Sequence, residues 1–143
     1  MAAAQALGLG YADCRFAQGL EVKDTTYASW PVALPSEFSA TFDVRADQPL
    51  EEHLVFVTWK GTAGSLSLGF DPLAGTFYLE DHLGRRVTLV FVLLAGDVVT
   101  FGISQNAAER ALFAASTATG AIAAASAALP PIGAFSTVHL YPA

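Results

Sequence analysis

The feature that most constrains this chain is a strict alternation of apolar and polar residues. Over residues 38–45, phenylalanine, alanine and valine fill the even positions, whereas serine, threonine, aspartate and arginine fill the odd ones. Successive side chains of a β-strand point to opposite faces, so this period of two predicts a strand with one buried face. An amphipathic helix would need a period of 3.6, which this segment does not have.

The same kind of pattern recurs along the chain. Further strands are predicted at 19–23, 54–60, 65–70, 76–80, 87–94, 98–104 and 136–141. Asp71–Gly75 has turn chemistry, because Pro72 fixes φ and Gly75 tolerates positive φ, so 65–80 is predicted to be a hairpin. Residues 87–94 are apolar on both faces, and we expect both faces to be covered. Seven or more short strands are typical of a β-sandwich or barrel.

One segment supports two interpretations. Residues 105–129 are rich in alanine, the strongest helix former, and Asn106 with Glu109 resembles a capping box. This favours a helix over 106–117. The alternative is a hairpin of two strands, 110–116 and 121–127, joined by a turn at Gly120.

Composition excludes several classes of protein. The chain has 143 residues, enough for one domain, and it is 53% hydrophobic but only 14% charged, which excludes disorder. Its net charge of −6 disfavours nucleic-acid binding. The single Cys14 excludes an intrachain disulfide and reads as a buried, inert thiol. The apolar run at 87–95 is too short to span a membrane, and Met1–Leu9 lacks the basic residues of a signal peptide.

The order of the predicted strands resembles that of laminin-G-like domains, in the concanavalin A-like superfamily. The resemblance rests on Phe-Ser-Ala-Thr-Phe-Asp-Val-Arg-Ala-Asp at 38–47, the strand at 54–61, the hairpin at 65–79 and the closing segment at 131–141. It implies an all-β, antiparallel β-sandwich of jelly-roll form, a single domain over 1–143 with an N-terminal arm of about residues 1–15. It also implies the hairpin rather than the helix in the alanine-rich segment. The chain departs from the family at Asp43, where tryptophan is usual, and at 85–89, where a Trp-His-His motif is missing.

Known catalytic patterns are not found. Glycosidases need two carboxylates flanking a sugar, but the adjacent Glu80 and Asp81 would point to opposite faces of a strand. Glu51 and Glu52 fall in a predicted loop, and none of the three histidines lies in a nucleophile motif. The segment 61–64 lacks the lysine of a phosphate-binding loop. We therefore predict that the chain is not an enzyme.

Ligand binding has weaker signals. The resemblance implies sugar binding by an aromatic platform beside polar groups, for which Trp59 and Tyr78, or Trp30, with Asp43 and Arg45 are the candidates. The competing interpretation places Trp59 in the core and makes Asp43 and Arg45 a solvated pair. No cofactor is predicted. The resemblance leaves calcium open, because five aspartates fall at predicted strand ends, although aspartate is common in turns. They are Asp24, Asp47, Asp71, Asp81 and Asp97.

By analogy, a β-sandwich without a signal peptide or a catalytic motif suits a component of a bacteriophage virion, such as a tail fibre, tail tip or decoration protein. The uncharged segment 111–134 further predicts a homo-oligomer or docking on other virion proteins. Partners then include a host surface glycan but neither nucleic acid nor membrane. The alternatives are a free-standing, extracellular carbohydrate-binding module and, third, a glycan-active enzyme.

Overall fold

The structure, a computed structural model, describes residues 5–7, 10–13, 18–21, 27–46 and 49–140. Within these ranges the chain forms strands and turns and no helix. The strands are β1 (Gln5–Leu7), β2 (Gly10–Asp13), β3 (Gln18–Glu21), β4 (Tyr27–Leu34), β5 (Phe38–Arg45), β6 (Leu54–Gly61), β7 (Gly64–Asp71), β8 (Thr76–Asp81), β9 (Arg86–Val90), β10 (Val98–Gln105), β11 (Arg110–Ser116), β12 (Ile122–Ala127) and β13 (Phe135–Leu140).

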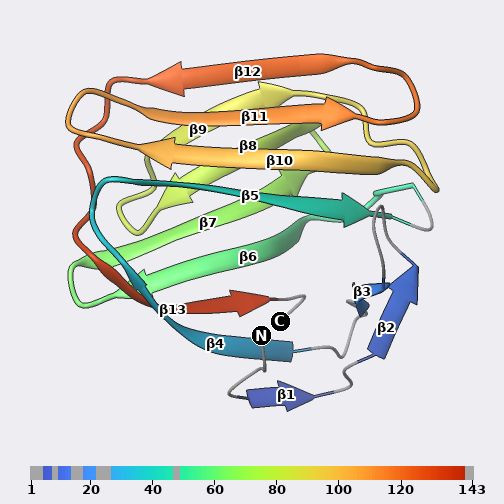
Figure 1. Cartoon of the computed structure of the whole chain (residues 1–143). Helices are drawn as coiled ribbons and strands as arrows, with labels where there is room; N and C mark the ends of the chain where they lie inside the picture. The colour runs from blue at the N-terminus through green and yellow to red at the C-terminus, as the bar shows by residue number, and fades with distance from the viewer. Residues whose placement is uncertain (1–4, 8–9, 14–17, 22–26, 47–48, 141–143) are drawn as a thin grey trace.

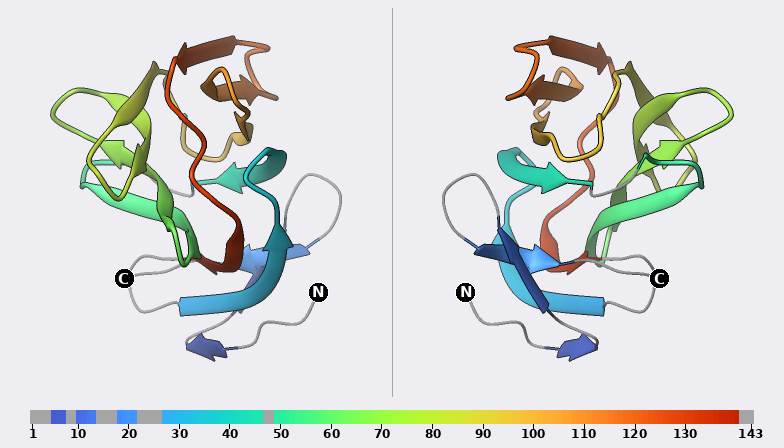
Figure 2. Two further views of the ribbon diagram at one scale, coloured as in Figure 1. Left: turned by 90° about the vertical axis from the view of Figure 1, so that its left-hand side faces the viewer. Right: turned by 90° about the vertical axis from the view of Figure 1, so that its right-hand side faces the viewer.

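The strands build two antiparallel sheets that pack face to face as a sandwich (Figures 1 and 2). The large sheet has the order β1-β4-β13-β6-β7-β8-β9, and the small sheet has the order β12-β11-β10-β5. A separate hairpin joins β2 to β3. The predicted all-β, antiparallel sandwich is confirmed.

Aromatic and aliphatic side chains fill the space between the sheets. Phe77 of the large sheet and Phe101 of the small sheet are fully buried, and their ring centroids lie 4.9 Å apart. Phe42 packs on Trp59 in the same layer. A β-bulge in β6 between Val55 and Val57 turns Phe56 inward as well, onto Phe77.

The alanine-rich segment forms the hairpin, not the helix. Strands β11 and β12 pair from Arg110 opposite Ala127 to Ala115 opposite Ile122, and Gly120 takes a φ of 72° in the turn. The helix-capping signal at Asn106 is real but serves another purpose. Its Oδ1 accepts hydrogen bonds from the N–H groups of Ala108 and Glu109, at 2.8 and 2.9 Å, within the β10–β11 turn. Burial of one alanine face against the core overrides helix propensity.

The expectation that residues 87–94 are covered on both faces is wrong. Val87, Leu89, Phe91 and Leu93 are buried, but Val90 and Val92 are 77% and 73% exposed. The strand also ends at Val90. The apolar segment 87–94 therefore has one buried face and one exposed apolar face, and it lies at the edge of the large sheet.

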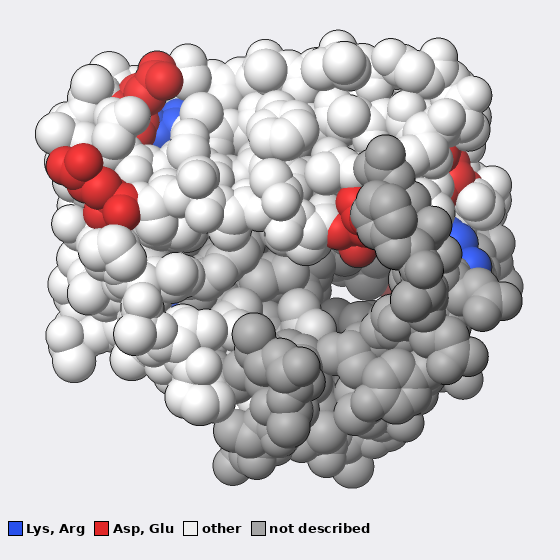
Figure 3. All heavy atoms as spheres, in the orientation of Figure 1, with Lys and Arg blue, Asp and Glu red and all other residues white. Residues whose placement is uncertain are grey.

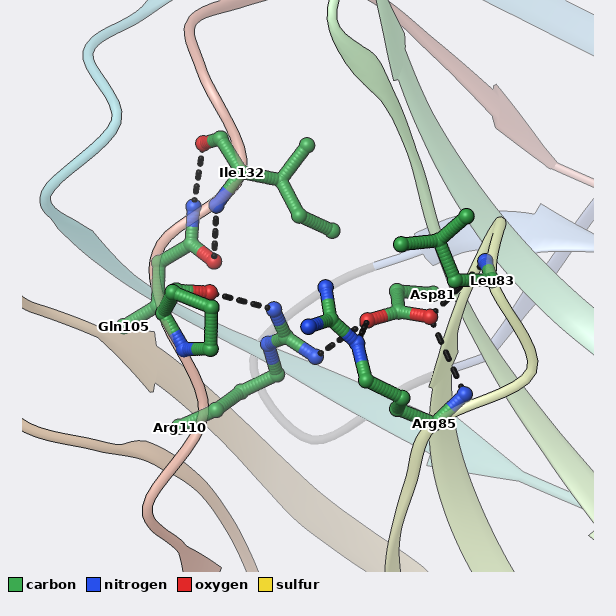
Figure 4. Close-up of polar contacts among 7 residues, drawn as sticks. Asp81, Leu83, Arg85, Gln105, Arg110 and Ile132 are labelled. Carbon is green, nitrogen blue, oxygen red and sulfur yellow. Dashed lines mark hydrogen bonds and ion pairs between the residues drawn. The ribbon is translucent and has the colours of Figure 1, made fainter.

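A buried ion cluster ties the two sheets together (Figure 4). Arg110, on β11, has no exposed surface and donates to Asp81 Oδ2 at 3.1 Å and to the carbonyl of Pro130 at 3.0 Å. Arg85 donates to the same carboxylate at 2.6 Å. Burial alone would raise the pKa of Asp81, but hydrogen bonds from the Arg85 backbone and side chain, from the Leu83 N–H and from Arg110 outweigh it and lower that pKa. Gln105 exchanges two hydrogen bonds with the Ile132 backbone nearby.

Some predictions fall outside the described residues. These include the state of Cys14, part of the predicted arm over residues 1–15, and the ends of the predicted strands at Lys23 and Tyr141. The side chain of Trp30 is likewise not described. In the remainder of the chain, the sequence missed β4, which contains Pro31, and also β1 and β2, which fall within the predicted arm.

Candidate functional site

The structure separates the residues predicted to bind a glycan. Trp59 lies in the core at 4% exposure, as the competing interpretation had it. Asp43 lies on the outer face of the small sheet, where its carboxylate accepts a 2.5 Å hydrogen bond from Thr100, and Arg45 follows at the end of the same strand. Tyr78 lies on the outer face of the large sheet, on the opposite side of the sandwich from Asp43. These residues do not share one surface.

The outer face of the large sheet carries a continuous line of polar side chains. Strand register places five residues side by side across β13, β6, β7, β8 and β9. We call this set the outer polar row, and it consists of His139, Thr58, Ser67, Glu80 and Arg86. At a strand spacing of about 4.8 Å, five strands give a row about 19 Å long.

Neighbours within the row are linked. The hydroxyls of Thr58 and Ser67 are 2.9 Å apart, and Arg86 forms an ion pair with Glu80. The Glu80 and Arg86 side chains keep 33% and 37% of their surface exposed, so both are open to a ligand. At the other end, burial and the charge of Lys60 lower the pKa of His139, which favours the neutral ring.

Tyr78 lies beside the row and contacts one of its members, Arg86. Its ring covers Gly69 of the neighbouring strand, where a Cβ atom would come within 2.4 Å of the tyrosine hydroxyl. The hydroxyl lies 2.6 Å from His53 Nε2, and the Arg86 guanidinium sits 4.0 Å above the ring. Burial raises the pKa of Tyr78, although the charge of Arg86 opposes this. Tyr78 is only 2% exposed, so a ligand at this position would meet the exposed His53 and Arg86 and not the tyrosine ring.

The carboxylates are arranged as the strand alternation predicts. Glu80 points outward into the row, whereas Asp81 points inward to Arg110 and Arg85. Asp71 accepts hydrogen bonds from its own turn, and Asp97 accepts them from Ser116, Thr117 and the Ala118 N–H. Hydrogen bonds and ion pairs within the protein thus account for Asp71, Asp81 and Asp97, while Asp24 and Asp47 lie outside the described residues. No cluster of three potential metal ligands occurs in the described part of the chain.

A pocket lined by other residues lies apart from the outer polar row. It has a volume of about 320 Å³ and an apolar lining. The lining consists of Pro49, Leu50, Phe70, Gly75, Phe91, Val92, Leu93, Leu94 and Ala95. It offers no charged or hydrogen-bonding side chain, so the outer polar row is the better candidate for specific recognition. No helix among the described residues could cross a membrane.

Sequence reasoning missed most of the row. It selected aromatic residues, whereas the structure brings together Thr58, Ser67, Arg86 and His139 around Glu80. The available signal was the outward-facing half of each alternating strand. What the sequence lacked was the order of the strands and their register.

Comparisons with known proteins show the fold. No known family and no curated protein matches the sequence. The enzymatically active domain of tailspike protein 2 from bacteriophage CBA120 matches with a TM-score of 0.64 and 14% identity over 93% of this chain. This chain spans only 24% of the length of that tailspike chain.

Two other solved structures are similar. Domain 4 of an extracellular arabinanase from Geobacillus stearothermophilus, solved with arabinotriose, has a TM-score of 0.57 and 16% identity, with 93% of this chain and 74% of that chain covered. A Scytalido-glutamic peptidase has a TM-score of 0.52 and 9% identity, with 80% and 63% covered. At these identities the likeness supports a jelly-roll-like sandwich and leaves the laminin-G-like assignment a prediction.

The prediction that the chain is not an enzyme is contradicted by these similarities. The similar structures include an enzymatically active tailspike domain, a peptidase and a domain of an arabinanase. The prediction failed because it searched for motifs within short stretches of sequence. On a sandwich, a site is assembled from residues on separate strands, as the outer polar row illustrates.

Proposed function

We propose that this chain is a glycan-binding β-sandwich domain of a bacteriophage tail protein and is carried on the virion. The glycan would bind along the outer polar row. The observation that carries this proposal is the continuous row of hydrogen-bonding side chains across five neighbouring strands. The likeness to a phage tailspike domain supports the tail assignment.

The chemistry of the row suits a chain of sugar hydroxyls. Each sugar hydroxyl both donates and accepts hydrogen bonds. The row offers both kinds of partner, because the Glu80 carboxylate accepts, the Arg86 guanidinium donates and the Ser67 hydroxyl does either. Hydrogen bonds to charged groups are the stronger ones, which places the main affinity at Glu80 and Arg86. Thr58 is only 5% exposed, so the part of the row that is open to a ligand comprises Ser67, Glu80 and Arg86. It is about 10 Å long, which has room for a short stretch of glycan.

The exposed apolar end of the same sheet adds a second kind of contact. Val90 lies on the outer face opposite Thr76, two residues along from the Thr88–Tyr78 pair. Val90 is four residues, about 13 Å, from Arg86 along β9, so a further unit of a longer glycan can pack its aliphatic C–H face against Val90 while another unit occupies the row. The arabinanase domain was solved with arabinotriose, so a sandwich of this shape can present an oligosaccharide-binding surface.

The test is glycan binding by wild type and a row variant. Glu80→Gln keeps the shape of the side chain but removes its charge and its ion pair with Arg86. After a glycan array has identified a ligand, calorimetric titration should show at least tenfold weaker binding, since about 1.4 kcal/mol corresponds to a factor of ten. Thr41→Ala, on the exposed outer face of the small sheet, is the matched control and should bind normally.

Two results would contradict the proposal. One is full binding by Glu80→Gln, and the other is an equal loss in Thr41→Ala. Release of new reducing ends from the bound glycan is measured in the same samples. If wild type releases them and Glu80→Gln does not, the row acts on the glycan as well as binding it.

The runner-up is a carbohydrate-binding module that works outside a virion. It is favoured by the arabinanase domain, of which this chain covers 74%. Neighbouring genes and recovery of the chain with purified phage particles separate the two proposals. A monomer that is retained on glycan resin but absent from particles would favour the module.

A further inference from the structure

Strand β12 is an edge of the small sheet. It pairs with β11 on one side, and no described strand pairs with its other side (Figures 1 and 2). It is six residues long and regular in register, without a bulge or a proline. An edge of this kind presents unpaired backbone N–H and C=O groups that can bind another strand.

The register identifies which backbone groups are free. In an antiparallel pair, hydrogen-bonded and non-bonded residue pairs alternate. The Ser116 N–H donates to the Ala121 carbonyl at 2.9 Å, so the residues bonded to β11 continue at 123, 125 and 127. The backbone groups of Ile122, Ala124 and Ser126 therefore face away from β11. The side chains of these three residues are also exposed.

The edges of β5 and β9 are protected, and that of β12 is not. Charged side chains discourage pairing at an edge, and β5 carries Asp43 and Arg45 whereas β9 carries Arg86. From position 111 to the end of the sequence there is no lysine, arginine, aspartate or glutamate. Figure 3 shows the same contrast, since the face over the small sheet is almost free of charged atoms except toward its margins.

We propose that a second copy of this chain pairs antiparallel along β12, about a two-fold axis at Ala124. Ala124 would face Ala124 of the second copy, and Ile122 would face Ser126 in both directions. These three pairs are all of the hydrogen-bonded type, so the contact forms about six backbone hydrogen bonds. The two small sheets then become one continuous eight-stranded sheet.

The composition of the β12 edge is compatible with an identical partner. The net charge of −6 on each copy opposes association as a whole, but no like charges face each other where two copies meet through this uncharged edge. Alanine and serine let the strands approach closely, and the contact covers Ile122, which is 76% exposed in the single chain. A two-fold contact is closed, so it stops at a dimer.

The test measures the dimer by light scattering and sedimentation on the 143-residue chain. Wild type should form a concentration-dependent dimer. Ala124→Pro removes an N–H that β11 does not use, so it should leave the fold intact and abolish the dimer. Ala115→Lys is the matched control, because Ala115 lies on the same outer face but in a strand with partners on both sides.

A charge exchange tests the register itself. Ala124→Glu and Ala124→Lys each place like charges directly opposite one another, and each should weaken the dimer at least tenfold, while an equimolar mixture should recover it as a heterodimer. A monomeric wild type would overturn the proposal. So would a dimer that survives Ala124→Pro, a dimer lost in Ala115→Lys, or a mixture that fails to pair. Circular dichroism on each variant identifies any that fail to fold.

Discussion

The two outer faces of this sandwich come from the same alternating pattern but carry different chemistry. The large sheet presents the outer polar row, with hydrogen-bonded and ion-paired neighbours. The small sheet presents mainly serine, threonine, glycine and alanine, with Phe113 lying over Gly102. The buried halves of the strands determine the fold, so the exposed halves are free to differ. We propose that the outer face of the large sheet binds a polar ligand, whereas the small sheet meets another chain at its β12 edge and not through its outer face.

The largest loss of stability is expected for substitutions in the core between the two sheets. Phe77→Ala removes a fully buried ring that packs on Phe101 across the sheets and should lower the free energy of unfolding by about 3–5 kcal/mol. Phe42→Ala, whose ring packs on Trp59, should approach the same range. Asp43→Ala, next in sequence but on the outer face, should cost less than about 1 kcal/mol. Urea denaturation measures all three, and equal losses would mean that β5 is covered on both faces.

The glycines beneath the two outer aromatic rings sharpen the comparison. A Cβ at Gly69 would meet both the Tyr78 side chain and the Leu54 carbonyl, whereas at Gly102 its three nearest neighbours would all be atoms of the exposed Phe113 ring. Gly69→Ala should therefore destabilise by about 2 kcal/mol and Gly102→Ala by about 1 kcal/mol or less, because Phe113 can swing into solvent. Thermal unfolding of the two variants checks the order. A reversed order would show that Tyr78 is not fixed by His53 and Arg86.

Acid should destabilise the fold, both at the Asp81 cluster that joins the sheets and at Asp97, which accepts a hydrogen bond from Ser116 of the small sheet. Asp81 and Asp97 both have folded pKa values below the ordinary one, because hydrogen bonds to each carboxylate outweigh its burial. A lowered pKa stabilises the fold at every pH above the unfolded value of about 3.9. This contribution begins to be lost below that value and disappears as the pH falls through the lower, folded pKa. The melting temperature should thus drop below about pH 4. Asp97→Asn should show a shallower drop than wild type, and an unchanged profile would contradict the assignment.

The sequence correctly predicted features that are determined within one strand, such as where the strand lies and which way its side chains point. The alternation at 38–45 located β5, and Glu80 and Asp81 point to opposite faces as expected. It failed where distant strands meet. β13 inserts between β4 and β6, and this placement puts His139 beside Thr58, which no local pattern encodes. The sequence selected Tyr78 as an aromatic platform for a sugar. In the structure its ring lies over Gly69 of one neighbouring strand and under the guanidinium of Arg86 from the other, so the ring is not open to a ligand.

The smallest effect tests whether the polar row is structured before any ligand arrives. Thr58 is 5% exposed, and the Ser67 hydroxyl is its hydrogen-bond partner at 2.9 Å. Ser67→Ala should cost about 1 kcal/mol, because it leaves the buried Thr58 hydroxyl without that partner. Thr41→Ala, at an exposed position on the other face, should change stability by less than about 0.5 kcal/mol.

A double-mutant cycle separates the bond from the side chains that make it. If the Thr58–Ser67 bond exists in solution, Thr58→Val together with Ser67→Ala should cost less than the sum of the single changes. Additive losses would mean that the two hydroxyls act independently and that the row is ordered only by a ligand. In that case the two outer faces would differ in amino-acid composition but not in how rigidly their side chains are held without a ligand.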